Sequence, residues 1–145
     1  MEFITHSVKE TEALAAAFAA SLAPGNVVAF QGGLGVGKTA FIRGIAQGLG
    51  VDGEVSSPTF ALVHEYPGEP SLIHFDMYRI HSLDDLYTTG YFDYLDTGAV
   101  IVIEWSENIS YVLDEATIYV TIEPLGENER KITIEGGTSF EYSSD

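Results

Sequence analysis

Residues 32–39 read Gly-Gly-Leu-Gly-Val-Gly-Lys-Thr, and this stretch decides the fold. It fits the phosphate-binding pattern G-x-x-x-x-G-K-[ST]. The apolar run Val27 to Phe30 precedes it, and apolar residues at helical spacing follow it as far as Leu49. The order of strand, glycine-rich loop and helix favours nucleoside triphosphate chemistry over the alternative, a glycine-rich turn that only joins a strand to a helix.

The glycines let consecutive backbone N–H groups turn toward phosphate oxygens, and the following helix points the positive end of its dipole at the same place. Lys38 is expected to reach the β and γ phosphates, and the Thr39 hydroxyl is expected to take one coordination position on Mg²⁺. The residues expected to line the nucleotide are Gly33, Leu34, Gly35, Val36, Gly37, Lys38, Thr39 and Ala40.

The composition suits one domain over residues 1–145, because 46% of the residues are hydrophobic and a chain of this length can bury a core. The 22 acidic residues outnumber the 6 basic ones, which gives a net charge of −16. Such a charge works against a direct grip on DNA or RNA. Two interpretations of the acidic surface remain open: it keeps the chain in solution, or part of it faces a basic protein partner.

Several kinds of site and segment are missing from the sequence. The absence of cysteine excludes disulfides and thiolate metal sites. The four histidines show no metal-ligand spacing, so we expect structural or surface roles for them. The N-terminus does not resemble a signal peptide and no apolar stretch approaches 18 residues, so we expect a cytoplasmic protein without a membrane segment.

The first half of the chain alternates between predicted helices and strands. Residues Ser7 to Glu10 resemble a capping box and predict a helix that runs as far as Pro24-Gly25. Strands are predicted over 60–66 and 72–75, and the five-residue link between them indicates an antiparallel hairpin.

The second half of the chain completes a sheet. After a partly helical stretch over 82–95, the unbroken apolar run 99–103 predicts a central strand that is buried on both faces. Alternating apolar residues over 118–122 and 132–134 predict a closing hairpin, and residues 139–145 are expected to fray. The predicted fold is α/β, a single P-loop NTPase-like domain with a mixed (parallel and antiparallel) central sheet flanked by helices.

Two acids, Asp76 and Glu104, stand where predicted strands end. Mg²⁺ prefers hard oxygen ligands, an attacking water must be oriented, and ligands collect at such strand ends in open α/β sheets. Alternatively, each acid is only the first solvated residue after its strand. Thr59 either approaches the γ phosphate or belongs to a plain turn, and Trp105 either lies near the site or packs in the core.

In chain order, the informative segments are Gly32 to Thr39, Ser57-Pro58-Thr59, His74 to Arg79 and Ile103-Glu104-Trp105. With these segments the chain resembles the bacterial TsaE (YjeE) family. Further matches are Arg43-Gly44, Gly90, Tyr94-Leu95 and the closing hairpin, so the resemblance spans nearly the full length. One departure is Ser106, which follows Trp105 where the family usually has proline.

The resemblance implies an ATPase of tRNA modification. In this family the protein works with TsaB and TsaD to install threonylcarbamoyladenosine on the adenine beside the anticodon. TsaD transfers the threonylcarbamoyl group, while the TsaE-like subunit binds the TsaB and TsaD pair and hydrolyses ATP. The implied ligands are ATP and Mg²⁺, and tRNA is reached only through the complex.

The resemblance also implies a role for each matching residue. Lys38 and Thr39 serve the phosphates and magnesium, Glu104 lies on the magnesium side, and Asp76 belongs to the metal shell or orients the attacking water. Thr59 senses the γ phosphate, and Glu10 or Thr11 and Arg130 lie near the base or sugar of the nucleotide.

Two other function classes compete with this interpretation. One is a nucleotide-dependent binding module in which hydrolysis is incidental. The other is a small-molecule kinase, but such enzymes usually close an arginine-bearing lid over the acceptor. With only Arg43, Arg79 and Arg130 available, the chain offers no arginine-rich lid segment.

Overall fold

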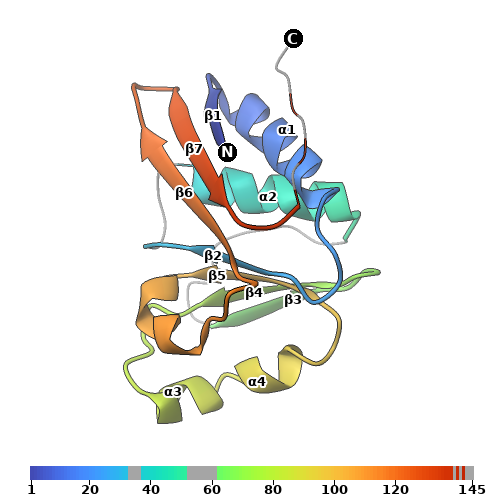
Figure 1. Ribbon diagram of the computed structural model, residues 1–145, viewed down its shortest axis with the longest axis vertical. Coiled ribbons are helices and arrows are strands. Elements are labelled where there is room, and N and C mark those ends of the chain that lie inside the picture. Colours follow the sequence, from blue (N-terminus) through green and yellow to red (C-terminus); the bar gives the residue numbers. More distant parts are fainter. Residues whose placement is uncertain (33–36, 52–61, 139, 141, 143–145) are drawn as a thin grey trace.

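One seven-stranded sheet organises the molecule, with the strand order β1-β7-β6-β2-β5-β4-β3 (Figure 1). The computed structural model describes residues 1–32, 37–51, 62–138, 140 and 142. The strands are β1 (Glu2–Thr5), β2 (Val27–Phe30), β3 (Val63–Tyr66), β4 (Leu72–Asp76), β5 (Val100–Glu104), β6 (Ile118–Pro124) and β7 (Arg130–Glu135). The helices are α1 (Val8–Ala19), α2 (Lys38–Leu49), α3 (Leu83–Tyr87), α4 (Tyr91–Tyr94) and the 3₁₀ helix η1 (Ser106–Val112).

The sheet is parallel in its centre and antiparallel at both edges, which confirms the predicted mixed sheet. Strand β2 pairs in parallel with β5 and β6, and β5 pairs in parallel with β4. The hairpins β3–β4 and β6–β7 are antiparallel, as predicted. Strand β5 is buried over its whole length between β2 and β4, which confirms the predicted central strand.

Helices cover both faces of the sheet. In Figure 1, α1 and α2 lie in the angle between the β1-β7-β6 part of the sheet and the β2-β5-β4-β3 part, and α3 and α4 lie across the opposite face of the latter. The alternation along β5 separates two cores, with Val100 and Val102 in one and Ile101 and Ile103 in the other. Within the described residues, no helix combines the length and apolar character needed to cross a bilayer.

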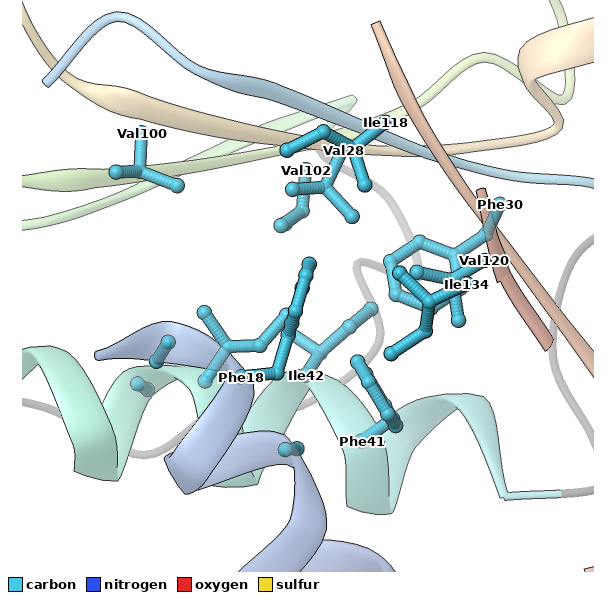
Figure 2. Packing of buried hydrophobic residues seen from close by; sticks show 14 of the residues in the cluster. Phe18, Val28, Phe30, Phe41, Ile42, Val100, Val102, Ile118, Val120 and Ile134 are labelled. Atoms are coloured by element: carbon cyan, nitrogen blue, oxygen red, sulfur yellow. The ribbon is translucent and has the colours of Figure 1, made fainter. Parts of the chain in front are cut away.

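The larger core joins α1 and α2 to the sheet. Figure 2 shows Phe18 and Ile42 directed from the two helices toward Val28 and Val102 on the strands. Phe41 makes an edge contact with Phe30, with ring centroids 5.8 Å apart. The apolar face of α2, the helix that follows the glycine-rich loop, therefore anchors this helix on the sheet.

Helix α1 begins as predicted and ends earlier than predicted. The Ser7 hydroxyl accepts the Glu10 N–H at 3.1 Å, which confirms the N-cap. The helix ends at Ala19 and does not continue to Pro24, because the next residues form tighter turns. The Ser21 N–H and hydroxyl both donate to the Phe18 carbonyl, and the Leu22 N–H donates to the Ala19 carbonyl.

Two features of the chain ends go beyond the sequence prediction. Strand β1 pairs antiparallel with β7, and the sequence analysis did not predict this strand. Two described residues of the tail also contribute to the core, although the tail was expected to fray. The Phe140 ring stacks on Phe3 at 5.4 Å, and the Tyr142 hydroxyl donates to the Glu10 carbonyl at 3.4 Å.

Helices α1 and α2 touch through glycine. A Cβ at Gly44 would collide with the Glu12 carbonyl oxygen and lie 2.6 Å from the Ala15 Cβ. A Cβ at Gly48 would lie 2.6 Å from the Ala16 carbonyl oxygen. Since the obstacle is backbone, no change of side-chain rotamer can relieve it.

We expect Gly44→Ala to lower the free energy of unfolding by at least about 2 kcal/mol, because overpacking outweighs the roughly 1 kcal/mol that alanine gains in helix propensity. Denaturant unfolding followed by circular dichroism measures the change. Gly126→Ala is the control, because a Cβ there meets nothing within 4 Å. Equal stability of the two variants would contradict the backbone contact.

Candidate functional site

The helix after the glycine-rich loop begins with an open N-terminus. Gly37 precedes it at φ 92°, a left-handed conformation that glycine adopts without strain, and the first helical bond runs from the Phe41 N–H to the Gly37 carbonyl. No side chain of the described residues caps this helix, whereas Ser7 caps α1. The N–H groups of Lys38, Thr39 and Ala40 therefore remain for an anion, at the positive end of the helix dipole.

Some of the predicted nucleotide residues lie outside the described residues. They are Gly33, Leu34, Gly35, Val36 and Thr59. Their assignments stay predictions. The described part of the predicted site consists of the helix start, the two acids and the residues near the base or sugar.

Three carboxyl ends of strands meet beside the helix start. Asp76 ends β4, Glu104 ends β5, and the two residues are register partners. The Trp105 N–H donates to the carbonyl of Gly32, just after β2, at 2.8 Å, and the Met77 N–H donates to the Glu104 carbonyl at 3.0 Å. The parallel order β2-β5-β4 thus brings both predicted acids to the edge from which the glycine-rich loop leaves.

Glu104 is buried, with 1% of its surface exposed. The period-2 alternation of β5 puts its side chain on the same face as Val102, which is the face covered by α2. Neither carboxylate oxygen has a hydrogen-bond partner among the described residues. The alternative that Glu104 is simply the first solvated residue after its strand is therefore wrong.

His74 lies next to this carboxylate, where the sequence predicted a structural or surface histidine. Its side chain is 1% exposed, and its Nε2 lies 3.5 Å from Glu104 Oε1. Neither ring nitrogen has a hydrogen-bond partner in the described part of the chain. The spacing His74-x-Asp76 on one strand was the available signal, because residues two apart on a strand share a face.

Asp76 is partly exposed, and the Tyr78 N–H donates to its Oδ1 at 3.1 Å. Burial raises the pKa of the Asp76 carboxyl above its usual value. The hydrogen bond from Tyr78 opposes this rise, and the negative charge of Glu104 adds to it. Two neighbouring carboxyl groups of this kind are poised for a cation, which would relieve their repulsion.

The acids fit a magnesium ion that is bound together with a nucleotide. The described residues contain no group of three or more His, Cys, Asp or Glu that could hold a metal. Mg²⁺ in phosphate-binding sites usually takes only one or two carboxylates and completes its shell with phosphate oxygens and water. The Glu104 oxygens, which lack hydrogen bonds among the described residues, are oxygen donors of the kind that such a shell uses, as are Asp76 and the Thr39 hydroxyl.

A small hollow of about 80 Å³ also lies at the start of α2. Its lining residues are Ser7, Val8, Thr11, Gly37, Ala40, Asn128 and Arg130. Its volume is well below the roughly 300–1,000 Å³ of ordinary ligand pockets, so it can receive only part of a nucleoside. The structure thus brings the predicted Thr11 and Arg130 to the start of α2.

The residues around this hollow differ in what they offer a ligand. The Thr11 hydroxyl is buried and shares a hydrogen bond with the Thr5 hydroxyl at 2.7 Å. Arg130 lies against the helix start, with its Nε 3.9 Å from the place that a Cβ on Gly37 would take. Glu10 does not line the hollow, and its carboxylate contacts His6 Nδ1 at 3.2 Å.

A larger cavity of about 490 Å³ lies at the opposite end of the strands. It is lined by Pro24, Gly68, Glu69, Pro70, Ser71, Thr97, Gly98 and Ala99. These residues precede β2, β4 and β5, so the cavity lies at the amino ends of the parallel strands. Because open α/β sheets bind their ligands at the carboxyl ends, we place the functional site at the glycine-rich loop.

Comparison with known proteins agrees with this geometry. A family model described as "Threonylcarbamoyl adenosine biosynthesis protein TsaE" matches residues 5–132. The chain belongs to the TsaE family. The resemblance stated from the sequence motifs is thereby confirmed.

Relatives in this family match over most of the chain. The tRNA threonylcarbamoyladenosine biosynthesis protein TsaE of Treponema pallidum is 37% identical over 134 residues, which is 92% of this chain and 99% of that protein. The protein of the same name from Bacillus subtilis is also 37% identical, over 92% of this chain and 84% of its own length. The crystal structure of YdiB from Bacillus subtilis superimposes with a TM-score of 0.74 and 32% identity, covering 95% of this chain and 86% of that one. The α/β fold is thus shared with a solved structure.

One contact at the site was not found from the sequence. Both carboxylate oxygens of Glu107 accept the Gly32 N–H, at 2.9 and 3.1 Å. Nothing in the sequence distinguishes Glu107 from the other acids of this acidic chain. Only the turn after β5 brings it to the loop.

We expect Glu104→Gln to leave the stability of the nucleotide-free protein unchanged or to raise it by about 1 kcal/mol, because the substitution removes a buried carboxylate without hydrogen bonds. The same variant should lose the magnesium dependence of nucleotide binding. Thermal unfolding and calorimetric titration of ATP with and without Mg²⁺ measure the two effects. A destabilised variant that keeps its magnesium dependence would show that Glu104 is a structural residue.

Arg130→Ala should weaken ATP binding about tenfold, because the side chain lines the hollow that is expected to receive the sugar or base and its positive charge favours an anionic nucleotide. Lys131→Ala is the matched control. It removes the same charge one residue away, from a side chain that contacts Glu2 at 3.5 Å. The measurement is the dissociation constant of Mg-ATP. An equal loss of affinity in both variants would show that Arg130 contributes only through the net charge of the chain.

Proposed function

We propose that the chain is the ATP-hydrolysing subunit of tRNA threonylcarbamoyladenosine biosynthesis. In this proposal it works in the cytoplasm with TsaB and TsaD, on the tRNA adenine next to the anticodon. One observation carries the proposal: the start of α2, which no side chain of the described residues caps, lies beside two strand-end carboxylates, of which Glu104 is buried and has no hydrogen bond to that part of the chain. Family membership and the names of the relatives support the pathway.

The chain's own residues divide the work between binding and hydrolysis. Lys38 binds the β and γ phosphates, and the free N–H groups of the first turn of α2 bind phosphate oxygens. When bound, Mg²⁺ supplies charge neutralisation to the phosphates, and Thr39, Glu104 and Asp76 are the residues that would hold it. The residues of the glycine-rich loop from Gly33 to Val36 and Thr59 complete the proposed phosphate contacts.

Asp76 is the proposed residue for orienting the attacking water. The hydrogen bond from Tyr78 fixes its Oδ1, so that Oδ2 can accept a hydrogen bond from water. The burial that raises the pKa of Asp76 also moves it closer to the range of a group that accepts a proton. Thr11 and Arg130 are proposed to contact the sugar or base. Glu10 is proposed only to lie near that site.

The charge of the chain supports a partner-bound role. A net charge of −16 opposes a direct grip on tRNA, so the tRNA is proposed to be reached only through the complex. The same charge suits contact with a basic surface of a partner protein. Assembly with TsaB and TsaD is therefore part of the proposal.

The purified protein should hydrolyse Mg-ATP slowly alone and faster, by at least about tenfold, after addition of TsaB and TsaD from the same organism. The lysine of a phosphate loop acts on the transferred phosphate, so Lys38→Ala should abolish both rates. Phosphate release measures the activity. ATP binding without any response to the pair would favour a nucleotide-dependent binding switch or a kinase.

A further inference from the structure

We propose that Glu107 is a positioning residue of the phosphate loop. Its carboxylate holds the N–H of Gly32, the first residue of the motif, and so sets the direction in which the loop leaves β2. This inference rests on the proposed function, because it assumes that the loop binds a nucleoside triphosphate. It adds a residue outside the phosphate-binding motif to the machinery that shapes the loop.

Both backbone polar groups of Gly32 are taken by one short segment of the chain. The N–H donates to Glu107 Oε1 at 2.9 Å and to Oε2 at 3.1 Å. The carbonyl accepts the Trp105 N–H at 2.8 Å. These partners lie more than 70 positions away in the sequence. Gly32 itself has φ 73°, so the chain turns sharply at the residue that these bonds hold.

The backbone at Trp105 makes the contact possible. Trp105 adopts φ 58° and ψ 41°, and it is the only residue other than glycine with a positive φ in the described residues. This conformation is unfavourable for a bulky side chain and occurs mostly at functional sites. It ends β5 and starts η1 at once, which brings Glu107 back to Gly32.

The segment is also anchored on its far side. The Asn108 side-chain amide donates to the Met77 carbonyl at 3.0 Å, and Ile109 is fully buried. The start of η1 is thus joined to the end of β4 as well as to Gly32. The backbone that carries Glu107 is therefore fixed relative to Gly32.

The hydrogen bond and the charge of Glu107 act in opposite directions. The Lys38 Nζ lies 2.9 Å from the place of a Cβ on Gly32, so a phosphate-binding ammonium group is close to the same residue. A negative carboxylate nearby repels phosphate. Because Glu107 is exposed to solvent, water and salt screen that repulsion, whereas the hydrogen bond acts directly on the loop backbone. We infer that positioning outweighs repulsion.

The test compares Glu107→Gln and Glu107→Ala with the control Glu115→Ala, which removes an exposed acid from the turn between η1 and β6. Calorimetric titration with Mg-ATP measures the dissociation constant. We expect the alanine variant to bind about fivefold more weakly, in line with the loss of one capping hydrogen bond. The glutamine variant, which keeps the acceptor and removes the charge, should bind as tightly as wild type or slightly more tightly. Glu115→Ala should bind like wild type.

A purely structural role is separated by thermal unfolding without nucleotide. The midpoints of all three variants should stay within about 4 °C of wild type, because the contact is on the surface. The proposal therefore requires that Glu107→Gln binds Mg-ATP more tightly than Glu107→Ala while the two variants are equally stable. If the alanine variant does not fold, weaker binding by the glutamine variant would still overturn the inference, because glutamine keeps the acceptor.

Three results would overturn the inference alone while wild type binds Mg-ATP. They are unchanged binding by Glu107→Ala, tighter binding by both variants to the same extent, and equally weak binding by both. The second result would mean that the carboxylate acts only by repulsion. Failure of the wild-type chain to bind Mg-ATP would instead overturn the proposed function, and this inference with it.

Discussion

The site depends on backbone hydrogen bonds between the ends of three parallel strands. The bonds from Trp105 to Gly32 and from Met77 to Glu104 join the chain just beyond β2, β5 and β4. They bring the start of the phosphate loop and both candidate acids to one edge, although these segments are far apart in the sequence. Because the apolar face of α2 packs on the sheet, the start of α2 and the two acids are held in their relative positions by the core.

This arrangement buries polar groups without giving them hydrogen bonds among the described residues. Glu104 and His74 are both buried, and their side-chain polar atoms lack hydrogen bonds in the described part of the chain. A buried polar group without a partner is unfavourable, and an apolar pair of similar size would serve the core better. Such local conflict with folding is typical of residues that are kept for a ligand. Trp105 is a second instance, because its positive φ is sterically unfavourable for a residue with a bulky side chain.

Much of the fold could be predicted from local sequence patterns, because each of these patterns is compatible with only one local structure. The apolar run in β5 has no polar side to expose, and the short link between β3 and β4 allows only an antiparallel return. The motif and the strand-end acids predicted a candidate site for the same reason, and the structure brings both acids to the edge from which the loop leaves. Features that depend on distant parts of the chain were not predictable. Strand β1 exists because β7 offers it an edge, and Glu107 reaches Gly32 only because Trp105 turns the chain back.

The glycine contact between α1 and α2 also limits how the molecule can respond to a ligand. Packed helices can shift by sliding only where their side chains can exchange neighbours. At Gly44 and Gly48 one helix rests on the backbone of the other, and there is nothing to exchange. Helix α1, with Thr11, and the start of α2, with Lys38, therefore belong to one rigid body. A movement that separates Thr11 on α1 from Lys38 on α2 would have to break this contact between the two helix backbones.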